Sequence, residues 1–244
     1  MRIEYDKIAA TYDDHRKGGG PYLDHLVTLA RRHGAQHVLE LGPGTGNNTQ
    51  AFLDAYPCRL TGLELSRGMI KRARAKPIPA QWVQGTATNI PLRGSSAEFV
   101  FGVYVLHHLP DLRTVFQECA RVLGSGCAAF VTATHDFIGR HPMNRYFPSL
   151  ARIDRARFQS LDDVEKTFRQ CGFSETGAAH FADAPRPIGP EYVERVASKI
   201  ISTYHLISSE EFSYGLSRLR ADVEKTGRLD VDMVWESVAV WGRK

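Results

Sequence analysis

Five strand-like segments, separated by helical patterns, run through the first 133 residues of this 244-residue chain. These segments are short and rich in apolar residues, and they cover residues 37–41, 59–65, 81–84, 99–105 and 127–133. Such alternation is typical of a parallel sheet, because neighbouring parallel strands need a crossover connection, usually a helix, between them. The segment 99–105 is almost uninterruptedly apolar, which predicts a central strand covered by helices on both faces.

The pattern changes after residue 183. Residues 184–190 form a cluster of chain breakers, and two amphipathic helical stretches follow between 190 and 224. The chain then closes with a strand-like run over 233–241. We therefore predict one α/β domain over 1–244, with a doubly wound, mostly parallel, Rossmann-like sheet, helices on both faces and an antiparallel last strand. In this interpretation residues 1–20 form an N-terminal cap segment, and residues 184–228 form a helical insertion before the last strand that is a lid on the substrate pocket.

Composition excludes several classes of protein. Hydrophobic residues make up 43% and charged residues 24% of the chain, which excludes collagen-like, coiled-coil and disordered chains. The formal charge of +4 is too small for a nucleic-acid-binding polyelectrolyte. The four cysteines are widely spaced and the N-terminus is charged, so we expect a cytoplasmic protein with reduced thiols, no metal, no membrane span and no nucleic-acid partner. The oligomeric state stays open.

A glycine-rich loop, Glu40-Leu41-Gly42-Pro43-Gly44-Thr45-Gly46, follows the first strand and precedes a helical segment over 47–55. Glycines adopt positive φ and let the backbone approach a ligand closely. A dinucleotide fingerprint needs its last glycine where Asn47 stands, and no Gly-Lys-Ser/Thr follows for a P-loop. NAD and ATP are therefore poor fits.

This loop resembles the first motif of the class I S-adenosylmethionine-dependent methyltransferases, in which an acidic residue precedes Gly-x-Gly-x-Gly. The resemblance covers most of the chain through four further stretches, which are the opening segment 5–13, Gly62–Ser66, 85–92 and Leu106-His107-His108-Leu109. The first and last of these resemble the small-molecule and quinone methyltransferase branch. The resemblance implies S-adenosylmethionine as cofactor, S-adenosylhomocysteine as product, and in-line methyl transfer to an O, N or C atom of a small-molecule acceptor.

The resemblance also implies which residues contact the cofactor: Tyr12, Glu40, Gly42, Gly44, Gly46, Glu64, Leu65, Thr86, Ala87 and Tyr104. Glu64 is expected to accept hydrogen bonds from the two ribose hydroxyls, as the acid ending the second strand does in dinucleotide folds. Thr86 stands where the family commonly has Asp, and its hydroxyl is a weaker acceptor for the adenine amino group. Glu40 either fixes the loop through hydrogen bonds or approaches the methionine amino group.

Two adjacent histidines, His107 and His108, are candidates for a general base, because histidine titrates near neutral pH. At most one of them faces the ligand, since adjacent residues leaving a strand point in different directions. Catalysis by proximity alone is the alternative. The arginine-rich segment 140–157 is either a clamp for an anionic substrate or a solvated helix face. A cofactor-binding regulatory or scaffolding protein without turnover is the alternative function.

Overall fold

The computed structural model describes residues 5–8, 13, 18–199 and 201–244. Two compact units are present. The sheet unit contains the described residues of 4–132 together with 159–181 and 237–244, and the helical unit contains 133–158 and 182–236.

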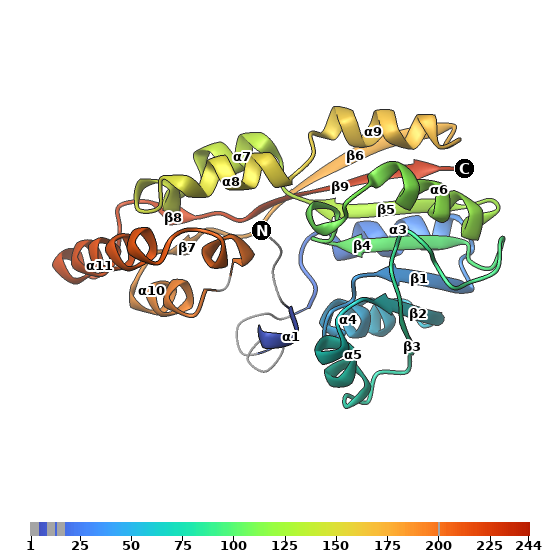
Figure 1. Ribbon diagram of the computed structural model, residues 1–244, viewed down its shortest axis with the longest axis horizontal. Helices are drawn as coiled ribbons and strands as arrows, with labels where there is room; N and C mark the ends of the chain where they lie inside the picture. Colours follow the sequence, from blue (N-terminus) through green and yellow to red (C-terminus); the bar gives the residue numbers. More distant parts are fainter. Residues whose placement is uncertain (1–4, 9–12, 14–17, 200) are drawn as a thin grey trace. The chain divides into compact units, whose positions relative to one another are not determined.

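Among the described residues, seven strands form one sheet in the order β3-β2-β1-β4-β5-β9-β6 (Figure 1). Their bounds are β1 His37–Leu41, β2 Arg59–Glu64, β3 Gln81–Gln84, β4 Phe99–Val103, β5 Cys127–Thr132, β6 Glu175–Ala182 and β9 Glu236–Arg243. The pairs among β1 to β5 are parallel, and β5 pairs with β9 in the antiparallel sense. The prediction of a mostly parallel, doubly wound sheet with an antiparallel last strand is confirmed.

Helices cover both faces of this sheet. Alternate residues of each central strand point to opposite sides, and both sets are apolar, so both faces need to be covered. Leu39 and Val100 belong to the core on the face of α6 and α9, whereas Val38 and Phe99 belong to the core on the face of α3 and α4. The helices of the sheet unit are α1 Tyr5–Ile8, α3 Leu23–Arg32, α4 Asn47–Ala55, α5 Arg67–Arg74, α6 Leu112–Leu123 and α9 Leu161–Gln170, with a short 3₁₀ helix η1 at Leu106–His108.

Polar side chains set the starts of two of these helices. Asp111 accepts from the Thr114 amide at the start of α6, and Ser160 accepts from the Asp163 amide at the start of α9. Both positions carry the N-cap signals that the sequence predicts. The bonds fix where the two helices begin.

The helical unit is built from short elements around an aromatic centre. They are α7 His135–Arg140, η2 Pro142–Arg145, α8 Ser149–Arg157, β7 Arg186–Pro187, α10 Pro190–Ala197, η3 Ser202–His205, α11 Ser209–Thr226 and β8 Asp232–Met233. The rings of Phe147, Tyr204 and Phe212 pack with centroids 5.1 to 5.8 Å apart. The two helical stretches predicted between 190 and 224 are present as α10 and α11, with η3 between them.

Two strand assignments differ from the prediction. Strand β6 is not predicted from the sequence, because Gly177 and three alanines leave it few of the β-branched and aromatic residues that are typical of strands. The predicted strand over 233–241 is divided instead, since Asp232–Met233 pairs with β7 and only Glu236 onward joins the sheet as β9.

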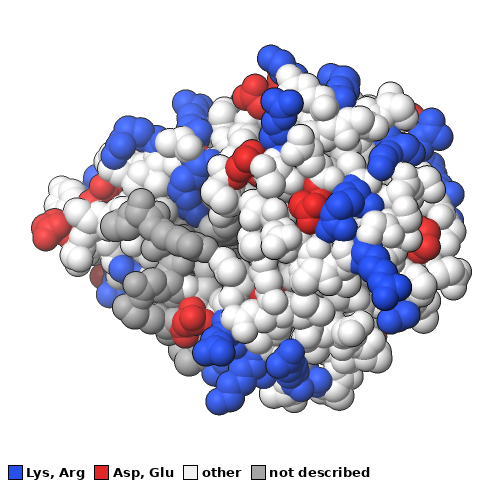
Figure 2. Space-filling view, turned by 45° about the vertical axis from the view of Figure 1, so that its right-hand side comes forward, with Lys and Arg blue, Asp and Glu red and all other residues white. Residues whose placement is uncertain are grey.

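Within the part of the chain that the structure describes, no helix has both the length and the hydropathy that a membrane span requires. On the face drawn in Figure 2, Lys and Arg side chains lie in separate groups with uncharged surface between them. The basic side chains on this face are thus dispersed.

Candidate functional site

The loops after β1, β2, β3 and β4 meet at one edge of the sheet, because these strands are parallel neighbours. In open α/β sheets, ligands bind outside the carboxyl ends of the strands where the strand order reverses. Here the order reverses at β1, which has β2 on one side and β4 on the other. The glycine loop directly after β1 is therefore the natural centre of a ligand site.

The glycine loop adopts a backbone that other residues avoid. Gly42, Gly44 and Gly46 have φ of +68°, +59° and +85°. A Cβ built on Gly42 would lie 2.6 Å from Cγ2 of Val105, so this position also lacks room for a side chain. Gly46 is the N-cap of α4, which directs the first amides of that helix toward the loop.

Glu64 ends β2 with its side chain folded onto two backbone amides. Oε2 accepts from the Gly44 amide at 3.0 Å and Oε1 accepts from the Ser66 amide at 2.8 Å. Burial raises the pKa of the Glu64 carboxyl, while these backbone hydrogen bonds lower it. A carboxylate has about four lone-pair sites, so acceptor capacity is left for ligand hydroxyls.

Glu40 is the penultimate residue of β1 and is buried, with 1% of its surface exposed. Its Oε2 accepts from Thr49 Oγ1 of α4 at 2.5 Å. Burial raises the pKa of the Glu40 carboxyl to about 8, and the nearby Glu64 adds to the rise. The Glu40 side chain is thus hydrogen-bonded to α4. A cationic ligand group close to it would favour its ionised form.

The remaining predicted contacts come from three loops. Leu65 follows Glu64 and is 51% exposed. Thr86 is exposed in the turn after β3, where its hydroxyl lies 2.9 Å from Thr88 Oγ1, and Ala87 packs partly against the core. Tyr104, after β4, has a φ of +52°, a conformation rare for a non-glycine residue and found at functional sites.

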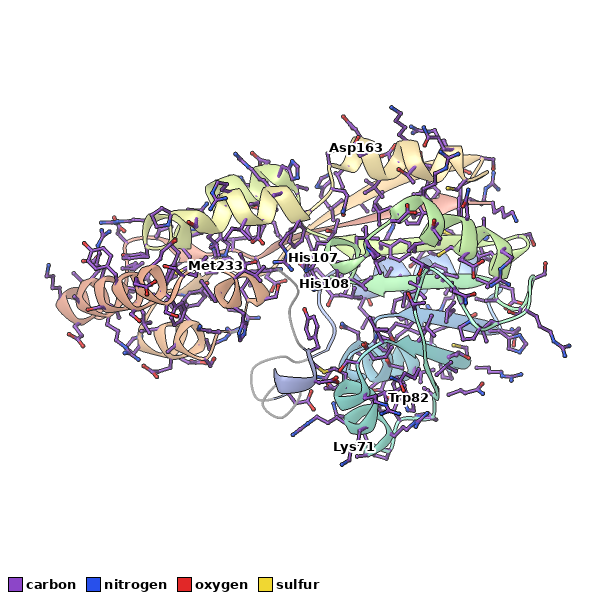
Figure 3. All side chains as sticks on the ribbon, viewed as in Figure 1. Lys71, Trp82, His107, His108, Asp163 and Met233 are labelled. Atoms are coloured by element: carbon purple, nitrogen blue, oxygen red, sulfur yellow. The ribbon has the colours of Figure 1, made fainter. Side chains whose placement is uncertain are left out.

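His107 and His108 lie side by side just beyond β4 (Figure 3), with ring centroids 3.9 Å apart. Nε2 of His108 lies 2.7 Å from the hydroxyl of Tyr5, and the two rings meet edge to face. Tyr5 comes from α1 at the start of the chain. This contact joins α1 to the loop after β4.

Two acids in the opening segment also reach this edge, and the sequence analysis did not single them out. Asp6 accepts from the hydroxyl of Ser66, and Asp13 accepts from the hydroxyl of Thr45. The signal available was the repeated Tyr-Asp pair in the opening segment. Tyr12, which was predicted to contact the cofactor, lies outside the described residues.

The arginine-rich segment belongs to the helical unit, where several of its side chains are paired. Arg140 donates to Glu236 and Asp136, and Arg157 pairs with Asp154. These two guanidinium groups therefore already have carboxylate partners within the helical unit.

The donor set fits the adenosyl cofactor that the motifs imply. Glu64 has a carboxylate fixed by two backbone amides that would suit vicinal hydroxyls. The three glycines remove side chains at alternate positions of the loop, and the exposed apolar side chain of Leu65 would suit a flat ring. A buried carboxyl at Glu40 complements a cationic group. Neither phosphate-binding spacing nor a basic residue in the loop favours a nucleotide phosphate.

Comparison with known proteins supports this interpretation. A family model described as "Methyltransferase domain" matches residues 39–131. An uncharacterized methyltransferase of Bacillus pumilus is 34% identical over 188 residues, which are 70% of this chain and 87% of the relative. The malonyl-[acyl-carrier protein] O-methyltransferase of Hahella chejuensis is 29% identical over 157 residues, or 58% of this chain and 56% of the relative.

Among solved structures, a protein from Anabaena variabilis, described as a methyltransferase of an antibiotic biosynthesis pathway, superimposes with a TM-score of 0.67 at 20% identity. The superposition covers 97% of this chain and 99% of that one, and it supports the fold. The chain spans well under two thirds of the length of three curated relatives it matches, with coverages of 26%, 57% and 56%.

Proposed function

Because this chain belongs to the class I S-adenosylmethionine-dependent methyltransferase family, we propose that it transfers a methyl group from this cofactor to an O, N or C atom of a small-molecule acceptor. The observation that carries the proposal is the pairing of the Glu64 carboxylate with the Gly44 amide at the carboxyl edge of the sheet. Curated relatives named as O-methyltransferases support oxygen as the first atom to test.

In this proposal, the sheet unit's own residues bind and orient the cofactor. Glu64 accepts from the ribose hydroxyls, Leu65 and Ala87 border the adenine, and Thr86 accepts from its amino group. The glycine loop supplies backbone amides, and Glu40 offers a carboxyl to the methionine amino group. Tyr12 and Tyr104 border the sulfonium end, because aromatic faces attract a cation.

The bound cofactor supplies an activated methyl group, so the protein needs chiefly to align the acceptor and exclude water. An acceptor that is already anionic or is a neutral amine needs no base. For an acceptor hydroxyl, His107 and His108 are the candidate general bases of the proposal, and Nε2 of His108 lies 2.7 Å from the Tyr5 hydroxyl. A histidine acting as the base would take the acceptor's proton on a free imidazole nitrogen and become an imidazolium, and general-base catalysis of this kind contributes about 10²–10⁴-fold in rate.

The free thiols of Cys58, Cys119, Cys127 and Cys171 support a cytoplasmic location, which is part of the proposal. Residues 184–228 stay a predicted substrate lid. Absence of nucleic acid among the partners also stays a prediction.

The test is incubation of the protein with methyl-labelled S-adenosylmethionine and a panel of small phenols, carboxylates, quinols and amines, with calorimetry for cofactor binding. Transfer to members of one acceptor class supports the enzyme. Tight cofactor binding without transfer to any member supports the regulatory alternative. Absence of binding contradicts the proposal.

A further inference from the structure

Asp6 and Asp13 are hydrogen-bonded to the loops after β2 and β1, the two loops that contact Glu64. Building on the proposed function, we infer that Asp13 and Asp6 are positioning residues for cofactor binding: they hold the loops after β1 and β2 so that Glu64 and the glycine loop keep their binding geometry. We call the residues Asp6 and Asp13 the N-terminal clasp. Both act through the loops, so neither needs to touch the cofactor.

Asp13 joins the glycine loop to the two helices beside it. Its Oδ1 accepts from Thr45 Oγ1 at 2.5 Å and from Asn47 Nδ2 at 2.9 Å. Its Oδ2 lies 2.9 Å from Nζ of Lys76, and the same ammonium donates to Asn47 Oδ1 at 2.6 Å. One carboxylate therefore connects the last part of the loop, the first residue of α4 and the residue just beyond α5.

Asp6 has the same relationship to the loop after β2. Its Oδ1 accepts from Ser66 Oγ at 2.6 Å and from the Gly68 amide at 2.7 Å. Ser66 is the N-cap of α5, and its hydroxyl oxygen also accepts from the Met69 amide. These hydrogen bonds lower the pKa of the Asp6 carboxyl, and those to Thr45, Lys76 and Asn47 outweigh burial and lower that of Asp13. Both acids are therefore charged at neutral pH.

The two ends of the clasp meet at Glu64. Ser66, which binds Asp6 through its hydroxyl, donates its amide to Glu64 Oε1. Gly44, which precedes the Thr45 that binds Asp13, donates its amide to Glu64 Oε2. Glu64 is thus hydrogen-bonded to two loops, and each of these loops is hydrogen-bonded to Asp13 or Asp6. Pre-organising a binding loop lowers the cost of ordering it when the ligand binds.

Residues 18 to 22 also contact α4. A Cβ on Gly18 would lie 1.9 Å from the Asn47 carbonyl oxygen, so the backbone there runs directly along the first turn of the helix. Gly19 donates its amide to Asn48 Oδ1 at 3.0 Å, and the Tyr22 hydroxyl donates to the Gly19 carbonyl at 2.8 Å. These contacts are independent of the carboxylate of Asp13, and they place Gly18 and Gly19 against the first turn of α4.

The experiment measures binding of S-adenosylhomocysteine by calorimetry and its dissociation by stopped flow, which needs no acceptor. We expect Asp13→Ala and Asp6→Ala each to weaken binding by about tenfold or more, as loss of hydrogen bonds to a charged group does. Thr45→Val tests the other partner of the Asp13 contact. If the clasp acts as inferred, the double variant Asp13→Ala/Thr45→Val binds no more weakly than the worse single variant.

Three controls separate positioning from general stability. Asp24→Ala changes an acid of α3 in the same unit, and its affinity stays that of the wild type. Asp13→Asn keeps an acceptor oxygen for Thr45 and restores part of the affinity. Gly18→Ala shifts the backbone against Asn47 and weakens binding with Asp13 intact, so the inference stays testable even where Asp13→Ala does not fold.

Wild-type affinity in the Asp13, Asp6 and Gly18 variants overturns the clasp and leaves the proposed function intact. Additive losses in the double variant also overturn it, because they show that Asp13 acts without Thr45. Absence of S-adenosylhomocysteine binding by the wild-type chain defeats the proposed function, and the clasp with it.

Discussion

Glu64 and Gly44 are joined by a hydrogen bond of 3.0 Å, in which the Gly44 amide donates to the Glu64 carboxylate across the ends of two neighbouring strands. The register pairs Glu40 with Gly62 and Leu41 with Leu63, so β1 and β2 end together. The glycine loop and the acid that faces it therefore form one structural element. A ligand that binds Glu64 also contacts a loop whose backbone is already directed toward it.

Replacing Glu64 with alanine removes the proposed acceptor for the ribose hydroxyls and leaves the Gly44 and Ser66 amides without this carboxylate. We expect affinity for S-adenosylhomocysteine to fall by about 1.5–3 kcal/mol for each hydrogen bond lost, or roughly 10- to 100-fold. Calorimetry measures the loss. The matched control is Glu98→Ala, because Glu98 also accepts two backbone amides, from Gln36 and His37, but lies at the opposite edge of the sheet. Equal losses of affinity in the two variants would contradict the assignment of Glu64.

The raised pKa of Glu40 predicts a dependence of stability on pH. With a pKa of about 8 in the folded chain and near 4.5 in the unfolded chain, the folded state binds more protons between these values. The free energy of unfolding therefore decreases as pH rises from about 4.5 to about 8, by at most about 1.4 kcal/mol for each pKa unit. Glu40→Gln removes this part of the slope. Urea unfolding of the wild type and of Glu40→Gln between about pH 4.5 and 8 measures the difference in slope. If the free energy of unfolding varies with pH in the same way in both proteins, the pKa of Glu40 is not raised in the folded chain.

Much of the fold follows from local pattern. The runs at β1, β4 and β5 are apolar enough to indicate strands covered on both sides, and the N-caps Asp111 and Ser160 mark where two helices begin. The place of Glu64 is also predictable, because parallel topology brings the ends of β1 and β2 to one edge. These features depend on residues close to one another in sequence.

The parts that were not predicted depend on distant contacts. Strand β6 has Gly177 in its interior and alternately exposed residues, and it exists because β9 offers it a pairing edge. Asp6 and Ser66 are 60 residues apart, and Tyr5 and His108 are 103 apart. The local motifs draw attention to these segments, but which side chains pair with one another depends on contacts between distant parts of the folded chain.

Alanine at Gly42 is expected to destabilise the fold through two separate effects. A non-glycine residue at φ +68° costs about 1–2 kcal/mol, and the new Cβ 2.6 Å from Val105 adds about 1–3 kcal/mol of overpacking. Gly34→Ala is the matched control, since Gly34 has a φ of +56° and open space around it. Urea unfolding gives both values. Adding Val105→Ala to Gly42→Ala should restore the part of the stability that is lost through the contact with Val105. If Gly42→Ala and Gly34→Ala lower the free energy of unfolding equally, that contact contributes nothing.

The helical unit contains an ion pair that is largely withdrawn from solvent. Arg157 Nη1 lies 3.4 Å from Asp154 Oδ1, and their side chains are 16% and 13% exposed. The Thr203 hydroxyl also donates to Asp154, while the guanidinium of Arg157 donates to the hydroxyls of Thr203 and Ser202. These bonds connect α8 to η3. Burial raises the pKa of the Asp154 carboxyl, although Thr203 and Arg157 oppose the rise.

Arg157→Ala leaves the Asp154 carboxylate buried without this cation, and such a loss costs about 3–5 kcal/mol. The double variant Asp154→Leu/Arg157→Met replaces both charges with apolar side chains and should recover most of the stability. Arg140→Ala is the control, because Arg140 is 54% exposed and its ion pairs contribute at most about 1 kcal/mol.

Hydrogen exchange separates the units: in Arg157→Ala, faster exchange is expected in α8 and η3 and unchanged exchange in β1 and β4. Uniformly faster exchange would mean that the pair stabilises the whole chain, because global unfolding would then expose both units together.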